Sequence, residues 1–251
     1  DSSSSSKSPR RHLYKKPVRN YRCQHDMKKD DDFADLANMC SRNLTDLEFH
    51  DVLGEGSFGT VYSVTGKDVN TGKILKLAVK IIRNADLDEM FYEVEMSYYM
   101  SEENIGPIVY DAFFLYDRIH KQYIQCVIME PFDMDCEKAL NLNISKEKKT
   151  VIFEKMVNLH LNLIKNKGMT CYDIKPVNYV YNEKSGKVRM IDFGSDWCNT
   201  NKPGTETETV LMIILILTQL GFLVVSNTVF NPVPVLRKKI TYVLSDGQNF
   251  Q

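Results

Sequence analysis

The chain has 251 residues, of which 43% are hydrophobic, so it is long enough to bury a core in one domain or in two small lobes. Its formal net charge of −1 argues against a protein that coats nucleic acid along its whole surface. The six cysteines are scattered without a Cys-x-x-Cys pair, which predicts free thiols in a reducing compartment rather than a disulfide framework or a zinc site. The polar, Ser-rich first ten residues do not resemble a signal peptide, so the expected location is intracellular, cytoplasmic or nuclear.

The first 30 residues carry a local excess of positive charge. Nine Lys or Arg stand against three Asp, a balance of +6. Few apolar residues are present to offset the entropy of ordering, which favours a flexible tail. The alternative is a basic arm for nuclear import, nucleic acid or an acidic partner, with Ser8-Pro9 as a modifiable site. Residues 33–39 are expected to form a short helix that packs on the domain.

A Gly-x-Gly-x-x-Gly pattern spans residues 54–59. Glycines let the backbone approach phosphate oxygens without a Cβ clash, with N–H groups turned inward. Dinucleotide-binding folds share the pattern, but there the third glycine opens a helix. Here residues 60–64 continue as a β-prone run, 70–72 predict a turn, and 74–80 form a return strand. The sequence therefore predicts a phosphate-binding β-hairpin.

Further elements follow along the chain. A helix is expected over 88–100 and an apolar strand over 123–129. Ser145 is suited to N-cap a helix running through Lys167, since one apolar stripe follows it and Gly168 ends it. Residues 178–191 predict a β-hairpin with a Gly-containing turn.

The strongest chemical signal lies around this hairpin. Asp173 is followed by Lys175 and Asn178, and Asp192-Phe193-Gly194 comes just after the hairpin. These charges suit phosphoryl transfer, in which the protein places a hydroxyl in line with a γ-phosphate and neutralises charge. Asp173 would accept the hydroxyl proton and Lys175 would steady the γ-phosphate. Asn178 and Asp192 would hold Mg²⁺ through oxygen ligands.

These motifs, in this order behind the glycine pattern and Ala78-Val79-Lys80, resemble the protein kinase family over roughly residues 46–225. The resemblance implies an α+β, bilobal protein-kinase-like fold. Residues 44–132 would form a small antiparallel β N-lobe with one helix and the hinge, behind a basic, largely flexible arm over 1–43. Residues 133–251 would form a reduced, mainly helical C-lobe with a C-terminal tail. ATP and Mg²⁺ are the implied cofactors, and a protein is the implied substrate.

The resemblance also implies that Lys80 pairs with the α- and β-phosphates and is held by a carboxylate from the next helix. Glu89, Glu93 and Glu95 are candidates, and Glu93 fits the family's spacing best. Glu93 and Glu95 lie on different helix faces, so both cannot reach Lys80. The segment between Lys80 and Glu93 is shorter than usual in the family, which leaves the approach of the helix open.

The family's hinge corresponds to Glu130-Pro131-Phe132. Backbone groups of Glu130 and Phe132 would bind the adenine edge. Pro131 lacks an N–H, which the middle hinge position does not need. The nucleotide-binding residues implied are Leu53, Gly54, Gly56, Ser57, Gly59, Val61, Ala78, Lys80, Met129, Glu130, Phe132 and Val180.

Two departures from the family affect function. The family's His-Arg before the catalytic Asp is Cys171-Tyr172 here. Without that Arg, a phosphate on the activation loop lacks its usual ionic partner, so we expect activity that does not depend on activation-loop phosphorylation. Lys175, in contrast, is typical of members specific for Ser and Thr.

The second departure is the missing Ala-Pro-Glu element after Gly194. Residues 210–225 are apolar all round, but they fall short of the ~20 residues that span a bilayer, so a buried helix is expected and a membrane span is not. Glu206 or Glu208 would bond the backbone of the catalytic loop, and residues 231–251 would cover the helix. The peptide-docking region is reduced, which predicts an activating or completing protein partner.

The leading prediction is an ATP- and Mg²⁺-dependent serine/threonine protein kinase. One alternative is an ATP-binding pseudokinase or scaffold that acts through a partner protein, which the intact Asp173 and Asp192 oppose. The other is a nucleic-acid- or virion-associated binding protein that uses the basic arm. The residues around Asp173 and Asp192 are also similar to those of kinases of large DNA viruses.

Overall fold

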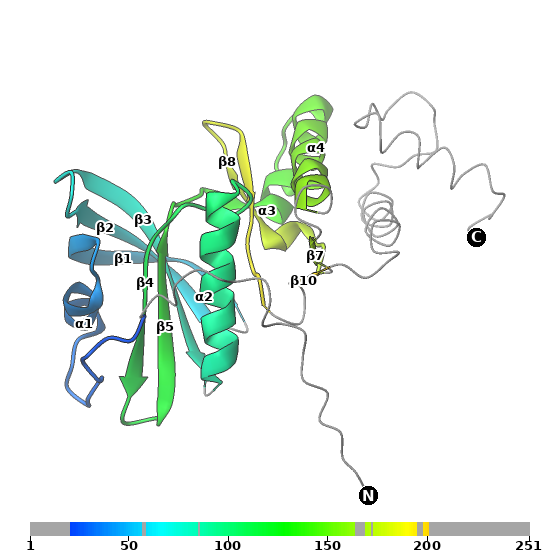
Figure 1. Cartoon of the computed structure of the whole chain (residues 1–251). Coiled ribbons are helices and arrows are strands. Elements are labelled where there is room, and N and C mark those ends of the chain that lie inside the picture. Colours follow the sequence, from blue (N-terminus) through cyan, green and yellow to red (C-terminus); the bar gives the residue numbers. More distant parts are fainter. Residues whose placement is uncertain are drawn as a thin grey trace, which may run out of the picture.

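The computed structural model describes residues 21–56, 59–84, 86–163, 169–171, 173–194 and 198–200. A β-rich lobe is followed by a smaller group of helices and short strands (Figure 1). The sheet of the first lobe is antiparallel, with strand order β1-β2-β3-β5-β4. Its strands are β1 Leu44–Gly56, β2 Gly59–Asp68, β3 Ile74–Asn84, β4 Val109–Asp117 and β5 Gln122–Met129.

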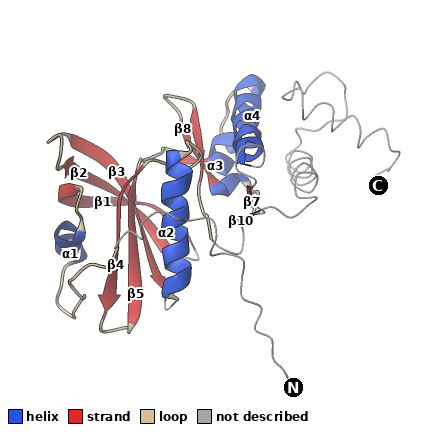
Figure 2. Cartoon of the chain, in the orientation of Figure 1, coloured by secondary structure: helices blue, strands red, loops and turns tan. Residues whose placement is uncertain are grey.

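Both faces of this sheet are buried. Successive residues of a strand point to opposite sides, so each strand contributes side chains to a cluster on each face. In β5, Ile124, Cys126 and Ile128 pack into one cluster. Val127 and the neighbouring Phe114 of β4 pack into a second cluster, on the other face. Helix α1, Phe33–Cys40, covers the first cluster, and α2, Leu87–Glu102, lies across the second (Figures 1 and 2).

Only two residues separate Asn84, the end of β3, from Leu87, the start of α2. Asp86 is its N-cap, and the Asp86 side chain accepts a hydrogen bond from the Glu89 N–H at 3.1 Å. A short polar side chain at this position satisfies one of the free N–H groups of the first turn. The helix predicted over 88–100 is therefore confirmed.

The second part of the molecule contains α3, Cys136–Asn141, and α4, Lys146–Asn162. Ser145 caps α4 as predicted, with its hydroxyl accepting from the Lys148 N–H at 3.3 Å. The predicted end of this helix at Lys167 lies outside the described residues. The remaining short elements are β6 Met134–Asp135, β7 Met169–Cys171, a 3₁₀ turn Pro176–Asn178, β8 Tyr179–Asn182, β9 Lys187–Met190 and β10 Cys198–Thr200.

The predicted hairpin over 178–191 is the β8–β9 pair, which joins β6 in a three-stranded sheet. A core cluster under it joins residues of α3 and α4 with Met96 and Met100 of α2, so the two parts share apolar contacts. The apolar run over 210–225, Glu206, Glu208 and the tail over 231–251 lie outside the described residues. No helix within the described ranges is long and apolar enough to cross a membrane.

Residues 21–43, which fall within the predicted flexible arm over 1–43, pack against the sheet. The Cys23 N–H donates to the Phe114 carbonyl at 2.9 Å, and the Met27 N–H donates to the Tyr116 carbonyl at 2.8 Å. Arg22 and Met27 each form a parallel bridge with β4, the edge strand. The unpaired edge of β4 supplies the backbone partners that the charge count could not reveal. The short helix expected over 33–39 is confirmed as α1. Residues 1–20 of the predicted arm lie outside the described residues.

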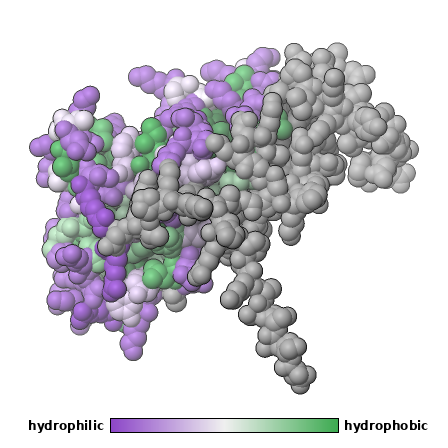
Figure 3. All heavy atoms as spheres, viewed as in Figure 1, coloured by the Kyte–Doolittle hydropathy of each residue, from purple (hydrophilic) through white to green (hydrophobic). Residues whose placement is uncertain are grey.

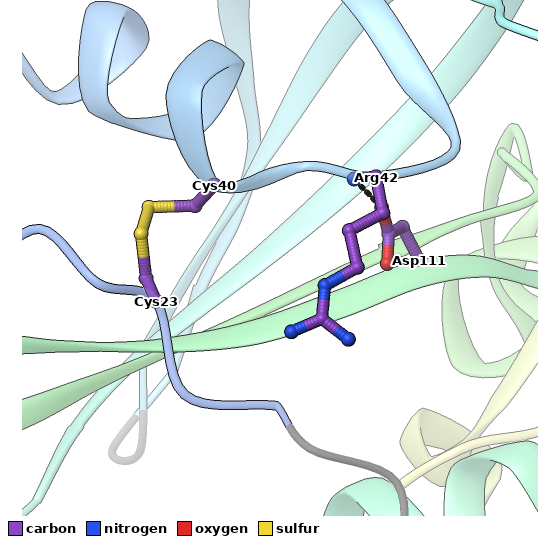
Figure 4. The surroundings of a disulfide bond; sticks show 4 residues. All are labelled: Cys23, Cys40, Arg42 and Asp111. Atoms are coloured by element: carbon purple, nitrogen blue, oxygen red, sulfur yellow. Dashed lines mark hydrogen bonds between the residues drawn. A yellow bond between two sulfur atoms is a disulfide. The ribbon is translucent and has the colours of Figure 1, made fainter.

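The prediction of six free thiols is wrong, because Cys23 and Cys40 form a disulfide (Figure 4). The two residues are 17 positions apart without any recognisable spacing, and α1 brings their Cα atoms to 5.2 Å. Cys171 is disulfide-bonded as well, whereas Cys126 and Cys136 are free and buried. Burial raises the pKa of Cys136 to about 12, so this thiol stays protonated at neutral pH.

Hydrophilic residues cover most of the face of the β lobe seen in Figure 3, where hydrophobic residues form small separate groups. Most of the large exposed hydrophobic residues of this lobe, such as Met39 and Ile74, come from separate elements, whereas Val52 and Leu53 are neighbours on β1. Scattered apolar residues of this kind are normal on a protein surface and indicate no binding site by themselves.

Candidate active site

The centre of the site is an ion pair between β3 and α2. Lys80 lies in the middle of the sheet, opposite Val61 of β2 and Val127 of β5. Its Nζ is 2.7 Å from Glu93 Oε1, and the two side chains expose only 22% and 14% of their surface. Among the three candidate glutamates, the structure therefore pairs Lys80 with Glu93, the one that the sequence favoured.

The charge of Lys80 is fixed by its surroundings. Burial alone would lower its pKa, but the carboxylate of Glu93 and the charge of Asp192 oppose this, and together they hold the pKa of Lys80 above its ordinary value. Lys80 is therefore an ammonium ion at neutral pH. Asp192, 112 positions further along the chain, thus lies near enough to Lys80 to raise its pKa.

The catalytic-loop residues form a second, connected group. The amide nitrogen of Asn178 donates to Asp173 Oδ2 at 2.8 Å and to the Asp173 carbonyl at 2.9 Å. Lys175 Nζ lies 2.7 Å from the same Oδ2. Pro176 opens the 3₁₀ turn that folds Asn178 back, since the Asn178 N–H donates to the Lys175 carbonyl at 2.9 Å. Asn178 and Lys175, both predicted site residues, thus contact the carboxylate of the third, Asp173.

Backbone hydrogen bonds join this loop to Asp192. The Ile191 N–H donates to the Asn178 carbonyl at 2.9 Å, and the Met190 N–H donates to the Ile105 carbonyl at 2.9 Å. Asp192 itself has a φ of 67°, a left-handed conformation that non-glycine residues adopt at a cost. Such a conformation persists when its surroundings impose it, which fits a residue held for a function.

Phe193 anchors the segment on its other side. Its ring is buried in the cluster that contains Met96 and Met100 of α2. A Cβ atom on Gly106 would lie 3.2 Å from this ring, so a side chain at position 106 would press on Phe193. Packing of Phe193 therefore couples the position of Asp192 to the C-terminal half of α2.

The hinge offers two backbone groups. The Glu130 N–H is used, because it donates to the Ile108 carbonyl at 2.8 Å. The Glu130 carbonyl and the Phe132 N–H have no hydrogen-bond partner among the described residues. The backbone of Glu130 and Phe132 was predicted to bind the edge of an adenine ring. The Glu130 carbonyl and the Phe132 N–H are the groups of these two residues that could do so.

Sequence reasoning missed one hinge residue, Lys187 of β9. Its Nζ forms an ion pair with Glu130 Oε1 and lies 5.9 Å from the centroid of the Phe132 ring. The Glu130 side chain also accepts from the Ile108 N–H through Oε2, at 3.3 Å. No local pattern signals this contact, because Glu130 and Lys187 are 57 positions apart.

The glycine hairpin has the predicted form over its described residues. Gly54 pairs with Val61 and Gly56 with Gly59, at the end of the hairpin where β1 leads into β2. A Cβ on Gly59 would lie 2.2 Å from the Ile81 carbonyl oxygen, so only glycine fits there. A Cβ on Gly54 or Gly56 would meet nothing within 4 Å.

The remaining predicted nucleotide-binding residues lie near this hairpin and the hinge. Strand alternation and register place Val61, Ala78, Lys80 and Met129 on the sheet face that α2 covers. Leu53 is exposed on β1, and Val180 is half-buried on β8. Ser57 lies outside the described residues.

The donor set fits a nucleotide-bound Mg²⁺ better than a metal held by protein alone. No group of three or more His, Cys, Asp or Glu side chains able to hold a metal occurs in the described part of the chain. Mg²⁺ commonly takes one or two protein oxygen ligands and completes its shell with phosphate oxygens and water. Asp192 offers a carboxylate, and Asn178 offers its amide oxygen, since its amide nitrogen is committed to Asp173.

Comparison with known proteins identifies the family. The family described as "Protein kinase domain" matches residues 47–211. The chain is 28% identical over 158 residues to the dual specificity protein kinase YAK1 homolog of Arabidopsis thaliana, an alignment covering 58% of this chain and 16% of that protein. It is 27% identical over 156 residues to the serine/threonine-protein kinase prpf4B of Dictyostelium discoideum, covering 57% of this chain and 18% of that protein.

The aligned segment thus spans less than a fifth of either relative. The match extends from the start of the β lobe to beyond Asp192-Phe193-Gly194 and so includes every described element of the site. The predicted α+β bilobal fold, with an antiparallel β N-lobe and a reduced, mainly helical C-lobe, is confirmed. The chain belongs to the protein kinase domain family.

Proposed function

We propose that the chain is an ATP- and Mg²⁺-dependent protein kinase that transfers the γ-phosphate to Ser or Thr hydroxyls of a protein substrate. The observation that carries this proposal is the charge of Asp192, distant in sequence, beside the ion pair of Lys80 and Glu93. Lys80 is paired with Glu93, and Asp192 acts electrostatically on the same ammonium group. A structural ion pair needs only two partners, whereas a third charge beside it suits a bound triphosphate with its cation.

The residues of the catalytic loop would carry the transfer. Asp173 accepts the proton of the substrate hydroxyl. The hydroxyl oxygen forms a bond to the γ-phosphorus while the bond between that phosphorus and the oxygen of the departing ADP breaks. Asn178 orients the Asp173 carboxylate through its amide nitrogen. Lys175 supplies positive charge beside the same carboxylate, where the transferred phosphoryl group would lie. Mg²⁺, held by Asn178 and Asp192, would neutralise charge on the β- and γ-phosphates.

Specificity for Ser and Thr is supported by Lys175 and by the relatives. One relative is named a serine/threonine-protein kinase and the other a dual specificity protein kinase. The proposed specificity is tested by phosphoamino acid analysis of the product. Phosphotyrosine as the main product would contradict it.

Independence from activation-loop phosphorylation is a further part of the proposal. It is supported by Cys171-Tyr172 standing where the family has His-Arg. Replacing Thr200, Thr205, Thr207 and Thr209 together by Ala should leave kcat within about twofold of the original. A folded quadruple variant without activity would contradict this part and leave the kinase assignment intact.

The decisive experiment measures transfer of labelled γ-phosphate from Mg²⁺-ATP by the full chain, to itself and to casein, with and without cell extract. Asp173→Asn should lower transfer by about a hundredfold or more while ATP binding persists. Asp30→Asn, the same change at an exposed position in the segment before α1, serves as the matched control. Nucleotide binding without transfer, under all these conditions, would overturn the kinase assignment in favour of a pseudokinase.

A further inference from the structure

Tyr21, from the segment before α1, packs against the helix that carries Glu93. Only 5% of Tyr21 is exposed. Its ring centroid lies 5.5 Å from that of Phe91 and 5.9 Å from that of Tyr98, both on α2. The Tyr21 hydroxyl donates a hydrogen bond to Glu95 Oε1, also on α2. One side chain thus contacts three positions of this helix.

The same residue is fixed to the sheet. The Phe114 N–H donates to the Tyr21 carbonyl at 2.7 Å, and the Tyr21 and Phe114 rings meet edge to face at 5.9 Å. Further along the segment, Asp26 pairs with Arg118 at 2.8 Å. The disulfide of Cys23 ties the segment to α1 on the opposite face of the sheet. Tyr21 is therefore part of an anchored strap and not of a loose tail.

The positions contacted form one stripe of α2. Phe91, Glu95 and Tyr98 are spaced by four and three residues, which places them on the same side of a helix. Glu93 lies two residues from both Phe91 and Glu95, so it points to the opposite side, about 160° to 200° around the axis. Met90 and Val94, between these two sides, are buried against the sheet.

This arrangement supports α2 on both flanks. On one flank, Glu93 reaches Lys80 in the centre of the sheet. On the other, Tyr21 rests on β4, the edge strand. A roll of α2 about its axis that moved Glu93 away from Lys80 would have to break the Tyr21 contacts as well. The strap and the ion pair consequently oppose the same motion.

We propose that Tyr21 is a positioning residue for phosphoryl transfer: it holds α2 by the flank opposite Glu93 and so maintains the Glu93–Lys80 pair. This inference rests on the proposed kinase function. In this arrangement the N-terminal segment of the chain itself holds α2 in position, through Tyr21, and no phosphate on the activation loop is required. Tyr21 touches no reacting group and acts through Glu93.

The kinetic test is a double-mutant cycle in the full chain. Tyr21→Ala should lower kcat/KM for ATP about tenfold or more, through both a lower kcat and a higher KM. In a Glu93→Gln background the same change should have less than about a twofold effect, because the pair that Tyr21 maintains is already lost. Tyr21→Phe, which keeps the ring contacts, should retain most of the activity. Equal effects of Tyr21→Ala in both backgrounds would overturn the proposal.

A matched control separates positioning from loss of stability. Phe49→Ala removes an aromatic ring that packs on Phe33 at 5.7 Å, on the sheet face away from α2. It should lower the stability of the same lobe and leave kcat/KM within about twofold of the original. If Phe49→Ala impaired catalysis as strongly as Tyr21→Ala, the effect would be general destabilisation and the proposal would fail.

A second measurement does not require activity. Amide hydrogen exchange should become faster across residues 87–102 in Tyr21→Ala and remain unchanged there in Phe49→Ala. Unchanged exchange of α2 in Tyr21→Ala would overturn the positioning role. If the original chain transfers no phosphate but α2 loosens as expected, the proposed function fails while the hold of Tyr21 on α2 stands.

Discussion

His160 makes the stability of the helical part depend on pH. It lies on α4 with 1% of its surface exposed, and its Nε2 is hydrogen-bonded to the Tyr179 hydroxyl. Its Nδ1 is buried and has no hydrogen-bond partner among the described residues. Burial lowers the pKa of His160 from 6.5 to about 4. The ring is therefore neutral at pH 7, and protonation in the folded state would place an unpaired charge in the core.

The sign of the effect follows from which state binds the proton more readily. In the unfolded chain His160 takes a proton near pH 6.5, whereas in the folded chain it does so only near pH 4. Between these values the unfolded state binds more protons, so stability is lost as the pH falls from about 6.5 to about 4. At about 1.4 kcal/mol for each unit of pKa, the full loss is about 3 kcal/mol. Above pH 6.5 His160 contributes no pH dependence.

Urea unfolding of the full chain, followed by circular dichroism at several pH values between about 7 and 4, measures this loss. His160→Gln keeps a polar group beside Tyr179 but does not titrate in this range. It should lose about 3 kcal/mol less than the original chain between the two ends of the series. His25→Asn, at an exposed histidine of the segment before α1, should follow the original chain. Equal pH dependence of the original chain and His160→Gln would refute the reasoning.

Two further predictions concern the segment around α1. Replacing Cys23 and Cys40 together by Ser should lower the free energy of unfolding by about 3 kcal/mol, because their separation of 17 residues sets the entropy of the closed loop; an unchanged urea midpoint would contradict this. Asp111→Ala should cost about 3 kcal/mol, because its carboxylate accepts three hydrogen bonds. Asp111 Oδ2 accepts from the Arg42 N–H at 2.7 Å (Figure 4), from the Ser41 hydroxyl at 2.8 Å and from the Asn43 N–H at 3.0 Å. A loss below about 1 kcal/mol in thermal or urea unfolding would show that water replaces the carboxylate.

The polar site was accessible from the sequence because its residues lie in short, ordered motifs. A short stretch, residues 173–178, contains Asp173, Lys175 and Asn178. Local backbone geometry sets the contacts between these side chains. Lys80 and Glu93 are 13 residues apart, joined by the end of a strand and the start of a helix. Over such distances the strand period and the helix period leave few arrangements, and the resemblance to the family's spacing favoured Glu93 among them.

Contacts between distant segments were not accessible in the same way. Tyr21 and Glu95 are 74 positions apart, and Arg42 and Asp111 are 69 apart. A single tyrosine or aspartate carries no pattern that names such a partner. Composition even pointed the other way, because the positive charge of residues 1–30 favours a solvated tail while Tyr21 and Cys23 are buried. The free edge of β4 was the missing information, and only the sheet order reveals it.

The short connection between β3 and α2, which left the approach of the helix open in the sequence, gains a physical meaning from these contacts. With β3 ending at Asn84 and α2 beginning at Leu87, the N-terminal end of the helix has little freedom to move relative to Lys80. Its C-terminal half is held by Met96 and Met100 in the cluster that contains Phe193. Rotation about the helix axis is opposed by Met90 and Val94, which are buried against the sheet. The contacts of Tyr21 add a restraint on the flank opposite Glu93, so the segment that looked least structured in the sequence helps to hold the helix that carries Glu93.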